Sequence, residues 1–296
     1  MRVSLILSLL LLAALVLTGV APGVVPTAQS ATATPTLVGI RAAHHPGFDR
    51  IVFVFRGGVP ATRRVRYVDR LIQDGSGEVM PIAGRAILQV TLSPAQAHNA
   101  AGGPTAAARR VFALPNIITA RRAGDFEAVT TYGIGLAKRT PIHVFTLRNP
   151  SRVVIDIRAA FGTTTRRVYF LNADNFVANR RPFFSPRLRP VRADAPAAGA
   201  LDRLFAGPLP GERADGLRLL GSGATGFSHL SIGNGIARLR LVGGCNSHGS
   251  TVSIAGEIMP TLRQLDSVRW VKIFDPRGGT KNPTGNTDSI PACLEP

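Results

Sequence analysis

Short runs of β-branched and aromatic residues, separated by glycine, proline and asparagine, fill the chain as far as residue 160. Strand-length runs spaced in this way indicate an all-β sandwich or barrel. The alanine-rich stretch 95–110 is interrupted by Gly102-Gly103-Pro104, so we interpret it as a loop and expect no long helix in this half. The expected strands cover residues 51–55, 65–68, 87–92, 142–147 and 153–157.

The pattern changes after a small polar break at residues 161–165. Leu201, Leu204 and Phe205 have helical spacing, and Gly207-Pro208 is a typical helix end. Short apolar runs continue on both sides of this helix. We therefore expect a mixture of helices and strands, with strands at residues 167–171, 188–191, 227–232, 236–242 and 268–274.

Two local patterns define the last hundred residues. Gly233-Asn234-Gly235 separates two alternating runs and predicts a tight hairpin, because positive φ costs little at these residue types. Apolar residues also repeat along one helix face from Ile254 to Leu265. Pro260 interrupts that face and predicts a kink or a helix that starts late.

The N-terminus has the pattern of a secretory signal. Arg2 precedes an apolar run over residues 3–20, and Ala28 and Ser30 place small side chains before a cleavage site. An uncleaved anchor is the alternative, because about 18 apolar residues begin to span a bilayer. Val20 follows Leu17-Thr18-Gly19 where a lipid-bearing cysteine would stand, so no lipid anchor is expected.

We therefore expect a signal peptide at residues 1–30, a linker at 31–35, and an exported mature chain without a membrane span. The cysteines fit an oxidising compartment. Cys245 and Cys293 predict one disulfide that ties the C-terminal tail, with two free thiols as the alternative. Closing such a loop contributes about 4 kcal/mol in the chain-entropy model.

The net charge of +18 comes from 35 Lys and Arg residues against 17 Asp and Glu residues, almost all of the positive ones arginine. The charge is +10 over residues 34–162 and +7 over 163–296, so it belongs to two surfaces and not to a tail. Export and an aromatic content of only 6% argue against nucleic acid. An anionic wall polymer and a general arginine bias remain as explanations. The candidate binding residues are Arg63, Arg64, Arg66, Arg121, Arg122, Lys138 and Arg139.

No motif for catalysis, a metal or a cofactor has its required context. Residues 221–226 match G-x-G-x-x-G, but a strand pattern follows where a dinucleotide site needs a helix. The pair His44-His45 is interpreted as exposed loop residues, and Asp49 and Asp156 as members of structural ion pairs. An unrecognised hydrolase using His143 or Asp156 is a weaker alternative. We expect no enzyme activity, no catalytic residue, no metal and no cofactor.

Residues 45–53 (HPGFDRIVF), 132–136 (YGIGL) and 150–156 (PSRVVID) resemble the AMIN-like domain of exported bacterial proteins. The resemblance covers residues 36–160. It implies a β-sandwich related to the domain that places cell-wall amidases on peptidoglycan. No amidase domain accompanies it here, so catalysis is not implied.

Residues 200–208 (ALDRLFAGP), together with 168–170 and 232–237, resemble the GerMN domain of sporulation and germination envelope proteins. This resemblance covers residues 166–296 and implies a small α+β domain without transferable catalytic residues. The sequence thus predicts an all-β sandwich followed by an α+β domain. The expected function is non-enzymatic binding of peptidoglycan or anionic wall polymer, as a scaffold or localiser for other envelope proteins. A protein-interaction module for another exported protein is the main alternative.

Overall fold

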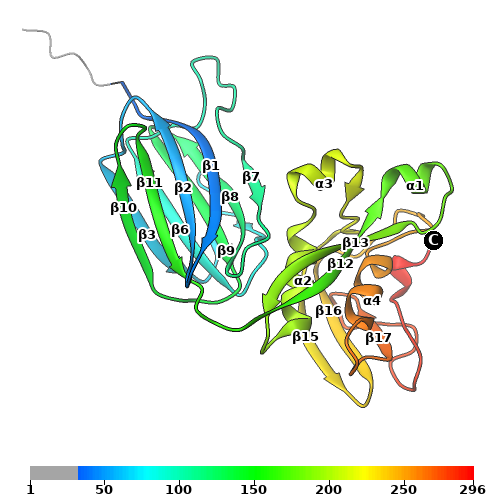
Figure 1. Cartoon of the computed structure of the whole chain (residues 1–296). Coiled ribbons are helices and arrows are strands. Elements are labelled where there is room, and N and C mark those ends of the chain that lie inside the picture. Colours follow the sequence, from blue (N-terminus) through cyan, green and yellow to red (C-terminus); the bar gives the residue numbers. More distant parts are fainter. Residues whose placement is uncertain (1–32) are drawn as a thin grey trace, which may run out of the picture. The chain divides into compact units, whose positions relative to one another are not determined.

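Two antiparallel β-sheets face each other in the first half of the protein (Figure 1). The computed structural model describes residues 33–296; the expected signal peptide and the start of the linker lie outside them. The first sheet has the order β1-β2-β11-β10. Its strands are β1 (Thr36–His45), β2 (Phe48–Arg56), β10 (Ile142–Leu147) and β11 (Arg152–Arg158).

The second sheet has the order β3-β6-β9-β8-β7. Alternate residues of both sheets fill the core between them, and Tyr132 joins the two layers. Its ring packs edge-on against Phe53 with centroids 5.7 Å apart, and its hydroxyl donates to the Ala107 carbonyl at 3.0 Å. The strands are β3 (Thr62–Val68), β6 (Ala86–Ser93), β7 (Arg109–Val111), β8 (Ile117–Phe126) and β9 (Val129–Leu136).

The connection from β3 to β6 contains a small hairpin, β4 (Leu71–Ile72) with β5 (Val79–Met80), and lies against the second sheet. Glycines in β9 make this close approach possible. A Cβ atom on Gly133 would lie 2.5 Å from Leu71 Cδ2, and one on Gly135 would lie 2.0 Å from the Ala83 carbonyl oxygen. The YGIGL motif therefore alternates core residues with glycines that admit the connection.

The second half of the protein has two three-stranded sheets of its own, β13-β12-β14 and β15-β16-β17. The expected hairpin is confirmed: Asn234 and Gly235 have φ of 51° and 75° between β15 and β16. β16 and β17 pair in parallel, which requires a crossover between them. The strands are β12 (Thr163–Asn172), β13 (Phe184–Arg192), β14 (Leu217–Arg218), β15 (Ala224–Gly233), β16 (Ile236–Gly243) and β17 (Trp270–Phe274).

Helices α2 and α4 pack on β12 and bury the second core. α4 starts at Ala255 and runs through Pro260, so the expectation of a late start is wrong. Ile258 and Leu262, on either side of the proline, are fully buried, and their packing outweighs the missing backbone hydrogen bond. The helices are α1 (Ala173–Val177), α2 (Pro196–Ala206), α3 (Pro210–Ala214), α4 (Ala255–Arg263) and the 3₁₀ turn η1 (Ala292–Leu294).

The expected disulfide between Cys245 and Cys293 is present, with 5.6 Å between the Cα atoms. It joins the end of the β15–β16 hairpin region to η1. The intervening tail is held by Lys272, whose ammonium donates to the carbonyls of Asn282 at 2.6 Å and Thr284 at 2.9 Å. Within residues 33–296, no helix is long and apolar enough to cross a membrane.

Residues 33–296 form one compact unit, and a buried arginine links its two halves. Arg203 of α2 is 2% exposed. One of its terminal nitrogens donates to the carbonyls of Phe112 at 3.0 Å and Ile117 at 3.2 Å. The other donates to the carbonyls of Leu114 and, at 3.2 Å, Pro115. The Asp49 carboxylate also holds this segment, because it accepts hydrogen bonds from the amides of residues 116 and 117.

A buried carboxyl group occupies the second core. Glu257 in α4 is 0% exposed and accepts hydrogen bonds from the amides of Leu171 at 3.0 Å and Leu220 at 3.2 Å. Desolvation raises its pKa from 4.5 to about 8, although the two amides oppose the shift. The folded protein therefore holds a proton at this side chain that the unfolded chain releases at neutral pH.

Glu257→Gln is expected to flatten the dependence of stability on pH. In the wild type, the proton held by Glu257 contributes to the free energy of unfolding. This contribution is fully present below pH 4.5 and is lost as pH rises towards 8, by at most about 1.4 kcal/mol per pH unit. Burial also raises the pKa of Asp202, to about 6; because that carboxyl is almost fully ionised above pH 7, the interval from pH 7 to 8 isolates Glu257. Urea unfolding at several pH values measures the slope. The exposed carboxyl of Asp266 provides a control, Asp266→Asn, which should keep the wild-type slope. An unchanged slope in Glu257→Gln would contradict the assignment.

Candidate functional site

The outer face of the β1-β2-β11-β10 sheet carries a cluster of rings around one arginine. Strand pairing assembles it, because Arg50 lies opposite Asp156, and Asp156 lies opposite His143. Within β2 the residues Ile51, Phe53 and Phe55 point into the core, so Phe48 and Arg50 point outward. We call this cluster the aromatic platform; its members are His45, Phe48, Arg50, His143, Phe145 and Asp156.

Arg50 is held rigidly at the centre of the aromatic platform. Its Nε and Nη2 donate to the two carboxylate oxygens of Asp156 at 2.6 and 2.8 Å. Its guanidinium also lies 5.3 Å from the Phe48 ring centroid and 5.2 Å from that of Phe145. The hydrogen bond to Asp156 raises the pKa of Arg50, so the group is permanently charged. With 32% of the side chain exposed, its remaining N–H groups can reach a ligand.

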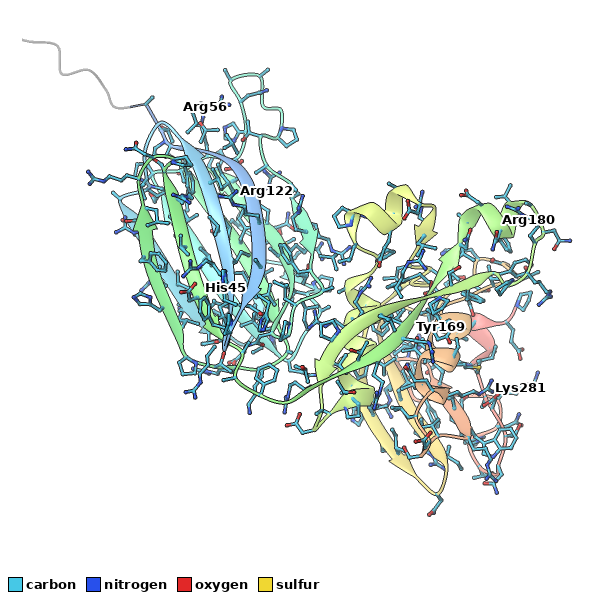
Figure 2. The ribbon with its side chains drawn as sticks, in the orientation of Figure 1. His45, Arg56, Arg122, Tyr169, Arg180 and Lys281 are labelled. Atoms are coloured by element: carbon cyan, nitrogen blue, oxygen red, sulfur yellow. A yellow bond between two sulfur atoms is a disulfide. The ribbon has the colours of Figure 1, made fainter. Side chains whose placement is uncertain are left out.

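The two histidines extend the platform at either side. His45 stacks on Phe48 with centroids 4.9 Å apart, and His143 stacks on Phe145 at 5.2 Å. Figure 2 shows His45 near one end of this sheet. Flat apolar ring faces next to oriented N–H donors suit a ligand that has both C–H faces and polar groups, such as a sugar ring.

The platform has a cationic border. Because side chains alternate along a strand, four further arginines share the outer face of the sheet. The acidic residue that these four strands place on the outer face is Asp156, and it is already paired with Arg50. The border should therefore attract anionic polymers in a salt-dependent way. Its arginines are Arg41, Arg56, Arg152 and Arg158.

The acidic residue between Phe48 and Arg50 has a structural role. Asp49 is fully buried and accepts hydrogen bonds from the amides of Asn116 at 2.6 Å and Ile117 at 2.9 Å. It also contacts His44 Nδ1 at 2.7 Å. The structural interpretation of Asp49 and Asp156 is confirmed. The interpretation of His44-His45 as loop residues is wrong, because both end β1, where pairing with β2 turns them to opposite faces.

The arginines expected to bind from sequence do not form one surface. Arg63, Arg64 and Arg66 lie on the edge strand β3 and are exposed, but alternation points Arg63 away from the other two. Arg121 and Arg122, adjacent in β8, likewise point to opposite faces. These five residues all belong to the second sheet and lie apart from the platform strands.

The remaining two candidates follow β9. Lys138 and Arg139 are exposed, and the Arg139 guanidinium lies 4.7 Å from the centroid of the Tyr67 ring in β3. Arg122 is partly neutralised by Asp125 at 3.6 Å, whereas Arg121 donates to the Pro81 carbonyl at 2.6 Å. The cation–π contact with Tyr67 therefore places Arg139 at the β3 edge, whereas Arg121 faces a separate cavity.

The strands of the fold place the glycine motif and the pair His143 and Asp156. The glycine motif at residues 221–226 leads into strand β15 and not into a helix, and its Ser222 hydroxyl accepts a hydrogen bond at 3.0 Å from the amide of Ile254, the N-cap residue of α4. His143 and Asp156 are neighbours, but both carboxylate oxygens of Asp156 bind Arg50. Among residues 33–296, no group of three His, Cys, Asp or Glu side chains is placed to hold a metal ion.

Comparison with known proteins bears on the sandwich. Residues 35–159 match the model of the AMIN-like domain, a range that contains β1 to β11 and the whole aromatic platform. No GerMN domain is found in the second half, so that resemblance stays a prediction. Searches of curated proteins and of solved structures give no significant match. The β-sandwich at residues 35–159 is an AMIN-like domain.

Proposed function

We propose that this is an exported, non-enzymatic envelope protein whose AMIN-like domain binds peptidoglycan through the aromatic platform. The C-terminal part, residues 166–296, would be a GerMN-type α+β domain that takes part in envelope binding or assembly. The whole chain would act as a scaffold or localiser for other envelope proteins.

Three observations support this proposal. AMIN-like domains are associated with peptidoglycan, and the match covers the platform strands. The disulfide fits a protein exported to an oxidising compartment. The observation that carries most weight is the platform geometry itself, in which Asp156 and two phenylalanine rings fix the Arg50 fork on an open sheet face.

The chemistry of peptidoglycan fits such a surface. Its sugar rings present C–H faces that can pack on Phe48 and Phe145, while its amide carbonyls and carboxylates accept hydrogen bonds from guanidinium N–H groups. The paired Asp156 removes the net charge of Arg50 but leaves N–H donors free. Ring contacts should therefore persist in salt, whereas attraction to the arginine border should not.

Replacing Phe48 and Phe145 together by alanine is expected to weaken retention on isolated cell walls about tenfold or more, because exposed ring contacts of this kind each contribute about 1 kcal/mol or more. Co-sedimentation of the mature protein with walls across a salt series measures the retained fraction. Wild-type binding should fall with salt to a plateau, and the double variant should lose the plateau.

Phe126→Ala provides the matched control, since Phe126 is 73% exposed on the other sheet. It should bind walls as the wild type does. Equal loss of wall binding in Phe126→Ala and in the double variant would contradict the proposal, as would no retention of the wild type even at low salt.

A further inference from the structure

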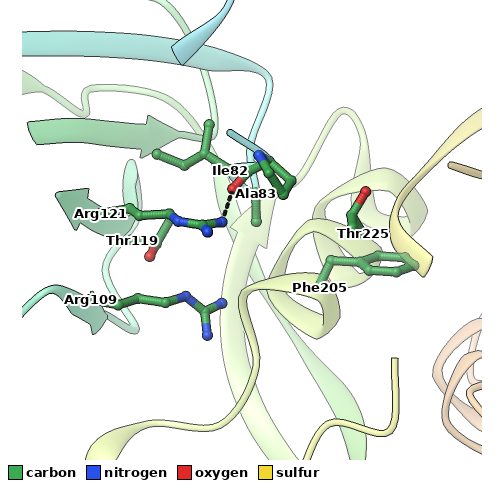
Figure 3. A pocket seen from close by; sticks show the side chains of 8 residues that line it. Ile82, Ala83, Arg109, Thr119, Arg121, Phe205 and Thr225 are labelled. Atoms are coloured by element: carbon green, nitrogen blue, oxygen red, sulfur yellow. Dashed lines mark hydrogen bonds between the residues drawn. The ribbon is translucent and has the colours of Figure 1, made fainter. Parts of the chain in front are cut away.

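A small cavity lies where strands β7 and β8 meet the C-terminal end of α2, away from the aromatic platform (Figure 3). Its volume is about 110 Å³. Arg109 and Arg121 line it from the sandwich, and Phe205 and Thr225 line it from the second half of the protein. The cavity thus combines cationic groups and hydroxyls from segments about one hundred residues apart in sequence.

Strand pairing brings the two arginines together. Arg109 in β7 is the cross-strand partner of Arg121 in β8. Figure 3 shows both side chains extending in the same direction, towards Phe205 and Thr225. The hydroxyl-bearing Thr119, two residues before Arg121, lines the same cavity. Residues two apart in a strand share a face, so this convergence follows from the fold.

Each guanidinium is anchored by a backbone carbonyl. Arg121 donates to Pro81 at 2.6 Å, and Arg109 donates to Ala206, at the end of α2, at 2.6 Å. An arginine side chain has five N–H donors, so each keeps donors for a ligand. Because the guanidinium forks are already oriented, binding a ligand costs less side-chain conformational entropy.

The positive charge at this cavity has no acidic partner. Among residues 33–296, no carboxylate forms an ion pair with Arg109, Arg121 or the nearby Arg213. Desolvation lowers the pKa of Arg109, and repulsion from Arg121 and Arg213 lowers it further. Arg121 is half-buried and Arg109 is exposed, and the repulsion between these two neighbouring charges is one that a bound anion would relieve.

We propose that this cavity binds a phosphate group. Two guanidinium forks with free N–H groups match the acceptor oxygens of a tetrahedral oxyanion. The Thr119 hydroxyl already donates to the Arg110 carbonyl at 2.8 Å and the Thr225 hydroxyl to the Val242 carbonyl at 3.4 Å, so the two arginines supply the donors. The size also fits. A cavity of about 150 Å³ is known to admit benzene, and a phosphate group is smaller than benzene, so a cavity of about 110 Å³ can hold it. The ligand would contact both halves of the folded unit. This site is independent of the platform and of the proposed wall binding.

The test compares the melting temperature of the mature protein in inorganic phosphate and in chloride at equal ionic strength. Phosphate should raise it, because a ligand that binds only the folded state stabilises that state. Titration calorimetry with inorganic phosphate gives the affinity. Arg121→Gln should weaken phosphate binding about tenfold or more, while Arg64→Gln, which changes an exposed arginine on β3, should not.

Arg109→Gln is a second variant, should Arg121→Gln fail to fold; it removes the other guanidinium from the cavity and should also weaken binding. Competition then identifies the source of the phosphate group. Glycerol phosphate, a soluble phosphodiester wall polymer and phosphatidylglycerol vesicles each report one source by displacing inorganic phosphate. Equal melting temperatures in phosphate and chloride, or identical titrations for wild type and both cavity variants, would overturn the proposal.

Discussion

Replacing Arg203 by alanine is expected to lower the free energy of unfolding by about 3 to 5 kcal/mol. The guanidinium is buried and donates to four carbonyls within residues 112–117, from the loop after β7 to the first residue of β8. Without it those carbonyls lose their donors, and Asp49 and Asp202 lose a nearby positive charge. Arg203→Lys should restore only part of the loss, because an ammonium lacks the planar fork that reaches four acceptors.

Unfolding followed by two spectroscopic probes tests whether Arg203 links the two halves of the protein. Trp270 is the protein's one tryptophan and reports on the second half, whereas circular dichroism is dominated by the strand-rich whole. The two transitions should coincide in the wild type and separate in Arg203→Ala, because the link between the halves is lost. Arg167→Ala changes an exposed arginine and should leave both curves unchanged. Coincident transitions at wild-type stability in Arg203→Ala would contradict this role.

Gly135→Ala is expected to destabilise the sandwich by about 3 kcal/mol, at the upper end of overpacking effects. The added Cβ would lie 2.0 Å from the Ala83 carbonyl oxygen, a backbone atom that cannot move aside as a flexible side chain can. The φ of Gly135 is not positive, so the cost comes from crowding and not from backbone strain. Thermal unfolding monitored by circular dichroism measures the change.

Gly226→Ala is the matched control for Gly135→Ala. Gly226 also lies in a strand, and a Cβ there would meet nothing within 4 Å. Its stability should stay within about 0.5 kcal/mol of the wild type. If Gly135→Ala were equally mild, the β3–β6 connection would not lie as close to β9 as the structure shows.

Several elements of the fold are predictable from local pattern alone. The five expected strands of the first half are present, as are the α2 helix and the Gly233-Asn234-Gly235 hairpin. The sequence pattern does not predict β8 and β9, because Arg121 and Arg122 interrupt the apolar alternation of β8 and glycines weaken the strand signal of β9. The tertiary pairing of β8 with β9 overrides both local signals.

The candidate site was less accessible to sequence reasoning. Phe48 and Phe145 are far apart in the chain and share the Arg50 guanidinium only because β11 pairs with both β2 and β10. A signal does exist: His143, Phe145 and Leu147 are the outward half of an alternating strand, where polar residues are usual. The arginine doublets in the sequence instead predict a surface on other strands, although neighbouring strand residues point to opposite faces.

The disulfide makes the C-terminal tail resistant to loss by proteolysis. Residues 281–287 are exposed and lie in the loop closed by Cys245 and Cys293. A protease that cuts one peptide bond there produces two chains that remain covalently joined. The cut ends also stay near β17, because the Ser289 amide donates to the Val271 carbonyl at 3.0 Å. A single nick would therefore leave the second half of the protein assembled until a reductant opens the disulfide.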